Sequence, residues 1–411
     1  MRCVLSPLAI ALACPLAIAS LRGEDAAASV TVGWRGDGTG VYASARPPLE
    51  WSSEEKKGII WKAKVGSGYS SPVAAGGRVL VTSEPDRLIC VESTDGKVAW
   101  EKRDGLADQA GAGPKRELPA KEAGYATPTP LTDGKSVFVT FGTGIVACHD
   151  LGGERRWIRH IDAPPASPYG RGSSPVLADG KLLISIGCLT ALDPATGKTL
   201  WESKGAVEAF GTPALTRIGG ATVAITGNGD CVRVSDGAIV EKGLGNSIYT
   251  SPVCGAGSVF FVGPQTVAVK LPEKLDGRQE FKRMWLTEME GEFFSSPVLL
   301  GGVLYAASNQ GTLHALDPVT GETIYEAHVD IPSQMSPPGV EPGHIYPSLS
   351  VAGGVLFLGN DKGDMLVAAL GKEFRKIGRN DLEEGAAGSP AFEGAFVYLR
   401  GGEFLYCIGA R

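Results

Sequence analysis

A repeated unit is the feature that most constrains the fold of this chain. The unit opens with a hydroxyl-bearing residue followed by proline, and continues with an apolar stretch, a turn usually built on glycine and a second apolar run. Its prolines are Pro72, Pro128, Pro175, Pro213, Pro252, Pro297, Pro347 and Pro390. The gaps between them average about 45 residues, a spacing typical of the blades of a β-propeller. Each unit is therefore expected to bury its apolar face against its neighbours in a ring.

The clearest unit covers residues 173–201 and predicts four short antiparallel strands, A to D. Its apolar and β-branched runs are separated by Asp179-Gly180 and Thr196-Gly197, which are typical of tight turns because glycine adopts positive φ. An aromatic residue falls at or near the strand D position of most units, where we expect it to pack against the next blade. These residues are Trp61, Trp100, Trp157, Trp201, Trp285 and Tyr325.

The two ends of the repeat array predict how the ring closes. The chain ends shortly after Leu405-Tyr406-Cys407, which matches strand C of the eighth unit, so this unit lacks a strand D of its own. Residues 59–63 have the strand D pattern of residues 199–203. We therefore predict an all-β fold over residues 59–411, an eight-bladed β-propeller of four-stranded antiparallel blades with the ring closed by an N-terminal strand.

The first residues have the layout of a secretory signal peptide. Arg2 precedes an apolar stretch up to Leu16, and Ala17-Ile18-Ala19 supplies small residues for cleavage, so residues 1–19 are predicted to be the signal and residues 20–58 a leader. A lipid anchor at Cys14 is the alternative. No later segment holds eighteen consecutive apolar residues, so no transmembrane segment is expected. The prediction is an exported protein of the periplasm or cell envelope.

Charge and cysteine content exclude other classes of protein. The formal net charge is −6 and the basic residues form only isolated pairs, so nucleic acid is not an expected partner. Beyond Cys3 and Cys14 the cysteines are widely spaced, with no C-x-x-C. Cys90, Cys148 and Cys407 fall in a small-residue position of strand C, which favours buried free thiols over disulfides.

The motif that ends the clearest unit resembles a known family. Ala191-x-Asp193-x-x-Thr196-Gly197-x-x-x-Trp201 is similar to the tryptophan-docking repeat of PQQ-like propellers, the quinoprotein alcohol dehydrogenase-like superfamily. Residues 315–325 repeat this pattern with Tyr325 in place of the tryptophan. The chain also resembles exported PQQ-like repeat proteins that begin with a segment like residues 34–40, and BamB-like eight-bladed propellers of outer-membrane assembly. Because one fold serves many functions, the resemblance leaves the function open.

No catalytic or metal-binding constellation is evident. The resemblance implies PQQ over the propeller axis, with Ca²⁺, a catalytic Asp, a stacking Trp and often an adjacent cysteine pair, but this chain has no Cys-Cys. Its five histidines show no metal-ligand spacing. We therefore expect no catalytic residue, no metal site and no cofactor, with PQQ and Ca²⁺ as the alternative.

Aromatic residues recur three positions before the repeat prolines, where strand A enters the axis. The candidate ligand-binding residues at this mouth are Tyr69, Tyr125, Phe210, Tyr249, Phe294 and His344. Such rings offer stacking area to a ligand, whereas the structural alternative is that they wedge between blades and close the channel. The connections from strand D to the next strand A join the same face, and such loops on a rigid ring carry function.

These patterns lead to two functional hypotheses. The first is a monomeric, non-enzymatic scaffold that binds a protein or polymer partner on the face of the D-to-A loops. The alternative is a PQQ- or other small-ligand-dependent oxidoreductase with its site at the axis mouth.

Overall fold

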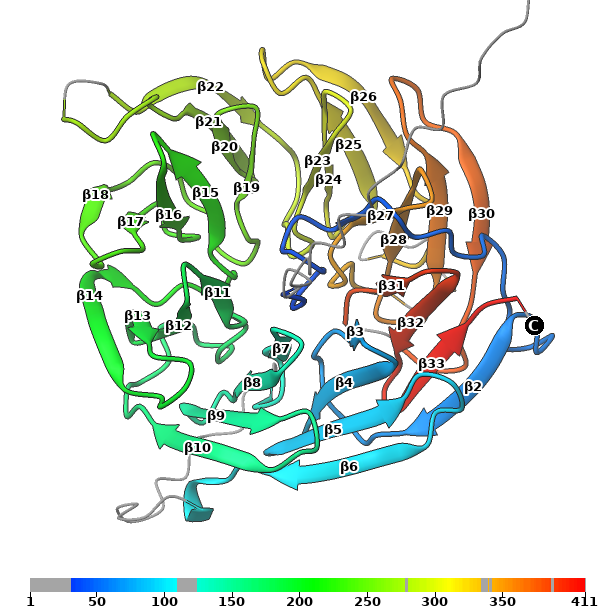
Figure 1. The fold of residues 1–411 in the computed structure, drawn as a ribbon. Helices are drawn as coiled ribbons and strands as arrows, with labels where there is room; N and C mark the ends of the chain where they lie inside the picture. The colour runs from blue at the N-terminus through cyan, green and yellow to red at the C-terminus, as the bar shows by residue number, and fades with distance from the viewer. Residues whose placement is uncertain are drawn as a thin grey trace, which may run out of the picture.

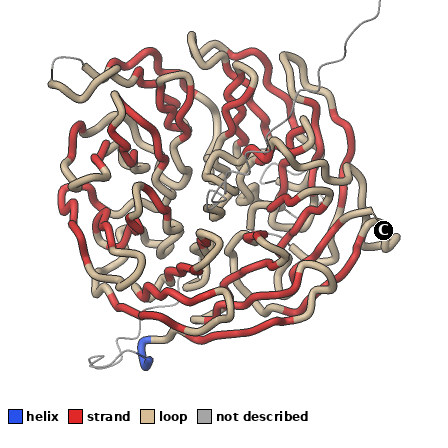
Figure 2. The backbone as a smooth tube through the Cα atoms, viewed as in Figure 1, coloured by secondary structure: helices blue, strands red, loops and turns tan. Residues whose placement is uncertain are grey.

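The computed structural model describes residues 31–108, 124–277, 280–333, 339, 342–385 and 388–410. Eight β-sheets stand around a central axis like the blades of a propeller (Figure 1). Strands and loops make up almost all of the described chain (Figure 2), apart from one 3₁₀ turn, η1 (Leu106–Asp108). The all-β, eight-bladed prediction is confirmed. The predicted signal peptide, including Cys14, lies outside the described residues.

Each blade takes its strands in chain order, except the eighth. The strands of blades 1 to 4 are β3 (Val73–Ala75), β4 (Arg78–Ser83), β5 (Arg87–Glu92), β6 (Val98–Arg103), β7 (Leu131–Thr132), β8 (Ser136–Thr140), β9 (Ile145–Asp150), β10 (Arg155–His160), β11 (Val176–Ala178), β12 (Lys181–Ile186), β13 (Cys188–Leu192), β14 (Thr199–Val207), β15 (Ala214–Ile218), β16 (Ala221–Ile225), β17 (Cys231–Arg233) and β18 (Ile239–Glu241). The strands of blades 5 to 8 are β19 (Val253–Gly255), β20 (Ser258–Phe261), β21 (Gln265–Lys270), β22 (Lys282–Glu288), β23 (Val298–Leu300), β24 (Val303–Ala307), β25 (Thr312–Leu316), β26 (Thr323–His328), β27 (Ser350–Ala352), β28 (Val355–Gly359), β29 (Met365–Ala369), β30 (Lys376–Asn380), β31 (Ala391–Glu393), β32 (Phe396–Arg400), β33 (Phe404–Ile408) and β2 (Ile59–Lys64).

The N-terminal strand closes the ring as predicted. Strand β2 pairs antiparallel with β33, from Ile59 opposite Ile408 to Lys64 opposite Phe404. The sequence did not predict a second N-terminal strand: β1 (Val41–Tyr42) runs parallel to β27 and adds a fifth strand to the inner edge of blade 7. The leader is therefore part of the folded ring.

A ring of hydrogen bonds links the inner strands around the axis. In each blade the backbone N–H of one buried hydroxyl residue donates to the hydroxyl oxygen of its counterpart in the next blade, at 2.8 to 3.1 Å, and the last returns to the first. The eight residues are Ser71, Thr129, Ser174, Thr212, Ser251, Ser296, Ser348 and Ser389. Each residue uses its own hydroxyl as the acceptor for one neighbour, so the Ser/Thr of the repeat is a structural requirement.

This ring corrects the register inferred from the prolines in two blades. In blade 2 the hydroxyl residue is Thr129, so the repeat proline is Pro130 and not Pro128. In blade 7 it is Ser348, so the corresponding position holds Leu349 and not Pro347. The sequence misled at blade 2 because Thr127-Pro128 and Thr129-Pro130 both fit the pattern.

The strand D tryptophans dock each blade onto the next. Five of them donate an indole N–H to a backbone carbonyl in the following C-to-D turn, at 2.8 to 3.1 Å. Each also covers a left-handed glycine of that turn, where an added Cβ would lie 2.5 to 2.7 Å from the indole. The tryptophan and glycine pairs are Trp61 with Gly96, Trp100 with Gly153, Trp157 with Gly197, Trp201 with Gly237, and Trp285 with Gly321. Substitution of any of these glycines would displace the indole ring from its packing position on the turn.

The leader crosses the opening at the A-to-B hairpin end before it reaches β2. Val32 exchanges backbone hydrogen bonds with Thr132 of blade 2. Arg35 is buried, and its Nη2 donates to the carbonyl oxygens of Pro297 and Leu349 in blades 6 and 7, at 2.8 and 2.6 Å. One side chain thus ties the leader to two blades, and its burial lowers the pKa of the guanidinium to about 10.

The cysteines of the described chain are free thiols, as predicted. Cys90, Cys148 and Cys407 are buried on strand C, each paired across the sheet with a docking tryptophan, and Cys231 is also buried. Cys188 and Cys254 are half-buried. Desolvation raises the pKa of Cys90 to about 11 and that of Cys148 to about 12, so these thiols stay protonated at neutral pH.

Candidate functional site

Two features of the ring are candidates for binding: an arc of aromatic rings on one face, and a groove between blades 4 and 5. The D-to-A and B-to-C connections meet on the face that holds the arc, because strand A runs from this face toward the A-to-B hairpins. Exposed apolar side chains occur on this face, namely Tyr69, Tyr169, Val207, Ile248 and Tyr346.

The aromatic arc runs from blade 3 to blade 7. Tyr249 is its centre, with ring centroids 5.6 Å from Tyr169, 6.1 Å from Phe210 and 5.0 Å from Phe294. Phe294 lies 5.3 Å from Tyr346 in an edge-to-face pair. The arc continues to His344, which stacks on Tyr346 at 4.9 Å with an interplanar angle of 9°. Gly172 leaves room for Phe210, since an added Cβ would lie 2.5 Å from that ring.

The structure brings together four of the six mouth residues named from the sequence. Phe210, Tyr249, Phe294 and His344 belong to the arc, although the corrected register gives the blade 7 position to Tyr346, with His344 behind it. Tyr69 holds the equivalent position in blade 1 with 45% of its surface exposed, away from the arc. Ligand binding by these rings stays a prediction.

Two residues of this region show where sequence reasoning went wrong: Tyr125 was named but lies outside the arc, and Tyr169 belongs to the arc but was not named. Tyr125 lies two residues before the corrected blade 2 position, which holds Thr127, so it is half-buried and outside the ring of equivalent sites. Tyr169 joins the arc from the long loop that precedes blade 3, where no repeat register identifies it. The available signal was a tyrosine three residues before Gly172, the small residue at the blade 3 position.

Carboxylates and amides in the B-to-C loops fix D-to-A segments of the chain on the face that holds the arc. Glu84 Oε1 accepts hydrogen bonds from the backbone N–H groups of Tyr125 and Ala126, at 2.8 and 2.7 Å. Asp361 Oδ1 accepts from the backbone N–H of His344 at 2.7 Å, and Asn309 Oδ1 accepts from Ile345 at 2.9 Å. These polar groups are satisfied by the protein itself, which supports a preorganised binding surface.

One buried ion pair stabilises the loops of blades 2 to 4. Arg171 Nε lies 3.0 Å from Glu208 Oε1 with both side chains 3% exposed, and Arg171 also donates to the carbonyls of Gly142 and Ala163. Burial raises the pKa of Glu208, while the Arg171 charge opposes that shift. Since the pair is enclosed and its donors are used, we assign it a structural role.

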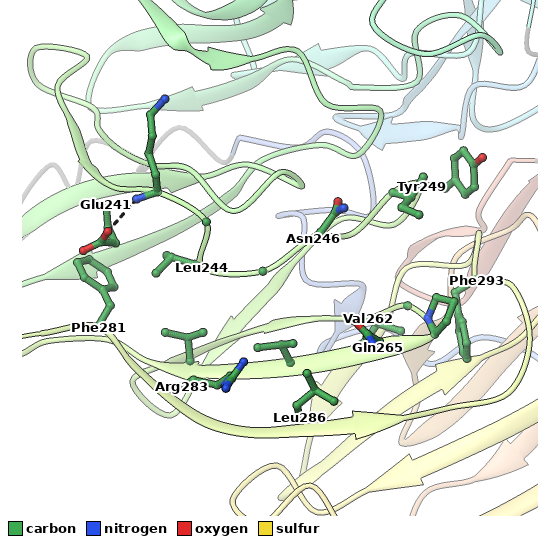
Figure 3. Close-up of a pocket in the computed structure, with 18 of the residues that line it drawn as sticks. Glu241, Leu244, Asn246, Tyr249, Val262, Gln265, Phe281, Arg283, Leu286 and Phe293 are labelled. Carbon is green, nitrogen blue, oxygen red and sulfur yellow. Dashed lines mark hydrogen bonds between the residues drawn. The ribbon is translucent and has the colours of Figure 1, made fainter.

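The groove lies at the seam between blades 4 and 5 (Figure 3) and has a volume of about 1120 Å³. Glu241 and Leu244 form the blade 4 wall, and Phe281, Arg283 and Leu286 form the blade 5 wall. At its inner end the groove reaches Ile248 and Tyr249, so it opens toward the aromatic arc. The apolar walls and charged rim have the composition of a binding groove.

The groove exists because this seam lacks the docking pair of its neighbours. In every blade a bulge in strand D sets the docking residue opposite a fixed position of strand C, and in blade 4 that residue is Glu241, opposite Cys231. The glycine that accepts a tryptophan from the preceding blade lies four residues before the docking residue of its own blade. In blade 5, whose docking residue is Trp285, that position holds Phe281. The absence of a tryptophan in unit four was a sequence signal for the groove.

The residues of the described chain do not fit a PQQ and calcium site of the quinoprotein type. No group of three His, Cys, Asp or Glu side chains within it is arranged to hold a metal ion. Five tryptophans are used in blade docking, and the carboxylates Glu84 and Asp361 of the B-to-C loops bind backbone N–H groups. We therefore derive no chemistry through that cofactor.

The fold and the docking repeat define the class of this protein as a PQQ-like β-propeller, in agreement with the resemblance noted from its motifs. The family described as outer membrane protein assembly factor BamB matches residues 49–327, and the chain belongs to that family. No helix among the described residues has the length and apolar character needed to cross a membrane.

Two curated relatives show how far the similarity extends. The chain is 24% identical over 292 residues to the outer membrane protein assembly factor BamB of Bordetella pertussis, covering 68% of this chain and 70% of that protein. It is 26% identical over 307 residues to the serine/threonine-protein kinase AfsK of Streptomyces griseus, covering 71% of this chain but only 34% of the kinase. The chain thus spans about a third of that relative, and the activity of the whole kinase does not transfer.

Solved structures share the fold at low identity. BamB from Moraxella catarrhalis superimposes with a TM-score of 0.60 at 14% identity, covering 85% of this chain and 98% of that one. A europium-containing methanol dehydrogenase gives a TM-score of 0.63 at 12% identity, covering 92% of this chain and 98% of the enzyme. Both likenesses concern the architecture and leave function to the residues of the sites.

Proposed function

We propose that this chain is an exported, non-enzymatic scaffold of the cell envelope that binds a protein partner on its D-to-A face and acts in outer-membrane protein assembly. The observation that carries the proposal is the aromatic arc centred on Tyr249, flanked by exposed apolar side chains on one face of a rigid ring. Tyrosine and phenylalanine supply large contact area at low entropic cost and are enriched at binding interfaces.

Three further observations support this function. The family is that of outer membrane protein assembly factor BamB, whose name describes an assembly role. The signal-peptide layout of residues 1–19 favours export to the periplasm or envelope. Carboxylates in the B-to-C loops of this face, such as Glu84 and Asp361, are engaged with the backbone and are not convergent in the way that general acid-base catalysis requires.

Site-specific photo-crosslinking tests the proposal. A photoreactive phenylalanine analogue replaces Tyr69 or Tyr346 on the D-to-A face, or Val319 in a C-to-D turn on the opposite face as the control, because Val319 is 68% exposed. In a Gram-negative host that exports the full chain, we expect a discrete protein adduct from the first two positions and none from Val319. Adducts from all three positions, or from none, would refute the proposed face.

The oxidoreductase alternative has its own decisive measurement. The purified protein is titrated with PQQ and Ca²⁺ while absorbance and dye-linked oxidation of alcohols and sugars are followed. A scaffold gives neither stoichiometric binding nor turnover. Stoichiometric binding with turnover that is lost on mutation of Tyr249 would establish the alternative and overturn the scaffold proposal.

A further inference from the structure

Among the described residues, every seam of the ring except one has an aromatic side chain at or over the docking position of strand D. The docking position of strand D supplies a tryptophan at five seams, and Tyr325 packs against Phe374 at the seam between blades 6 and 7, with ring centroids 6.4 Å apart. The remaining two docking positions hold Gly378 in blade 7 and Glu241 in blade 4. These two seams show different solutions to the loss of the aromatic residue.

At the seam of blades 7 and 8, an extended segment from outside the blades supplies the missing ring. Trp51 of the leader is 3% exposed and stacks on Phe357 at 6.5 Å with an interplanar angle of 15°. Its backbone N–H donates to Asn380 Oδ1 at 2.7 Å, and its Cβ lies against Gly58, the left-handed glycine that precedes β2. The molecule therefore already contains one seam that is completed by a peptide segment carrying a tryptophan.

At the seam of blades 4 and 5, the described chain supplies no such segment, and the 1120 Å³ groove remains. Phe281 lies here at the position that Phe374 holds between blades 6 and 7. It is half-buried against the core of this seam, but it faces Glu241 in place of an aromatic docking residue. Val267 and Val269 extend the apolar floor beside it. A half-buried phenylalanine beside an apolar floor gives the aromatic side chain of a partner a ring and an apolar surface to pack against.

We infer that this seam binds an extended segment of a partner protein. An aromatic side chain of that segment packs against Phe281 and fills the space that an aromatic docking residue would fill if Glu241 were one. The segment would lie along the groove toward Ile248 and Tyr249, which connects the seam to the aromatic arc. The inference rests on the proposed function and deepens it, because it names the chemistry by which the partner is held.

The rim of the groove is consistent with a polypeptide as the occupant. The acidic residues Glu241, Glu280 and Glu292 and the basic residues Lys242 and Arg283 line the groove together with apolar side chains. A lipid chain would find charges of both signs at the entrance, whereas a peptide presents N–H and C=O groups and charged side chains on either side of its aromatic residue. The mixed rim thus favours a short sequence with an aromatic anchor.

The test copies the filled seam into the open one. Glu241→Tyr introduces the residue that pairs with a phenylalanine between blades 6 and 7, so it should fill the groove and leave the fold intact. Glu241→Gln removes the charge but leaves the groove open, and Glu202→Tyr makes the same change on β14, where Trp201 already docks. Melting curves first establish that all three variants are folded.

The probe is a random peptide library displayed on phage and selected on the full-length wild-type protein. We expect the selected peptides to be enriched in Trp, Tyr or Phe, and to bind Glu241→Tyr about tenfold or more weakly in fluorescence anisotropy. Their affinity for Glu241→Gln and Glu202→Tyr should stay within about twofold of wild type. Phe281→Ala, which keeps Glu241, should weaken binding and serves if Glu241→Tyr fails to fold.

Three results would overturn the inference: no enriched peptide, enriched peptides without an aromatic residue, or equal affinity for wild type and the filled or Phe281→Ala variants. Failure here is separate from failure of the proposed function. If the crosslinks at Tyr69 and Tyr346 persist while peptides ignore the seam, the scaffold function stands and only the seam assignment is lost.

Discussion

Trp51 provides a quantitative test of the idea that the leader completes the ring. Its side chain is 3% exposed, and a buried aromatic of this size removes about 150–250 Å² from water, which corresponds to about 4–6 kcal/mol at 25 cal/mol per Å². Trp51→Ala should therefore lower the free energy of unfolding by about 3–5 kcal/mol, the range observed for large-to-small core substitutions. Urea denaturation followed by circular dichroism measures this change.

The indole nitrogen of Trp51 sharpens the test. Trp51 Nε1 is buried without a hydrogen-bond partner, whereas Trp61 Nε1 donates to the carbonyl of Ser93 at 2.8 Å. Trp51→Phe should thus cost less than Trp61→Phe, because only the second loses a hydrogen bond worth about 0.5–1.5 kcal/mol. A loss below about 1 kcal/mol for Trp51→Ala, as for a surface substitution, would refute the assigned role of the leader.

Three other expectations follow from the packing. Tyr249→Ala should destabilise the fold by about 1–3 kcal/mol in urea denaturation, because it breaks three ring pairs. Tyr69 is 45% exposed, so Tyr69→Ala should change the stability by less than about 0.5 kcal/mol. Equal effects of the two substitutions would contradict the packing of the arc around Tyr249. Burial lowers the pKa of His314, so the unfolded chain binds its proton first and stability should fall as the pH drops below about 6.5; a His314→Gln variant with an unchanged pH profile would disprove this source. The four buried cysteines, Cys90, Cys148, Cys231 and Cys407, should react with a thiol reagent at pH 8 much faster in guanidinium than in the native state, and rapid native reaction of all four would contradict their burial.

The repeat made the ring predictable, because strand periodicity, turn glycines and docking tryptophans all follow from local sequence. The closing strand that begins at Ile59 was predictable for the same reason, because it carries the strand D pattern but precedes the first repeat unit instead of following the last. The predicted register of the repeat was wrong where the local sequence offered two equivalent choices, as at Thr127 and Thr129. It was also wrong where the proline was absent, as after Ser348. There the hydrogen-bonded ring around the axis, a tertiary feature, decides.

Long-range contacts by non-repeating segments were the part that sequence could not provide. Arg35 bonds to carbonyls 262 and 314 residues away, and no periodicity connects these positions. The candidate site divides in the same way: Phe210, Tyr249 and Phe294 share a repeat position and were found, whereas Tyr169 enters the arc from a loop. A site built partly from non-repeating loops is therefore only partly visible in the pattern.

The three docking positions without tryptophan bear on why one seam stays open. Tyr325 keeps an aromatic pair with Phe374, and Gly378 makes way for Trp51 of the leader, so two of the losses are compensated within the molecule. Glu241 is different, because it leaves Phe281 and its apolar floor facing a groove. Exposed apolar walls reduce stability, and proteins depart from local consistency mainly at functional sites. An open seam in a ring that closes its others therefore favours a groove kept for a partner over a simple packing defect.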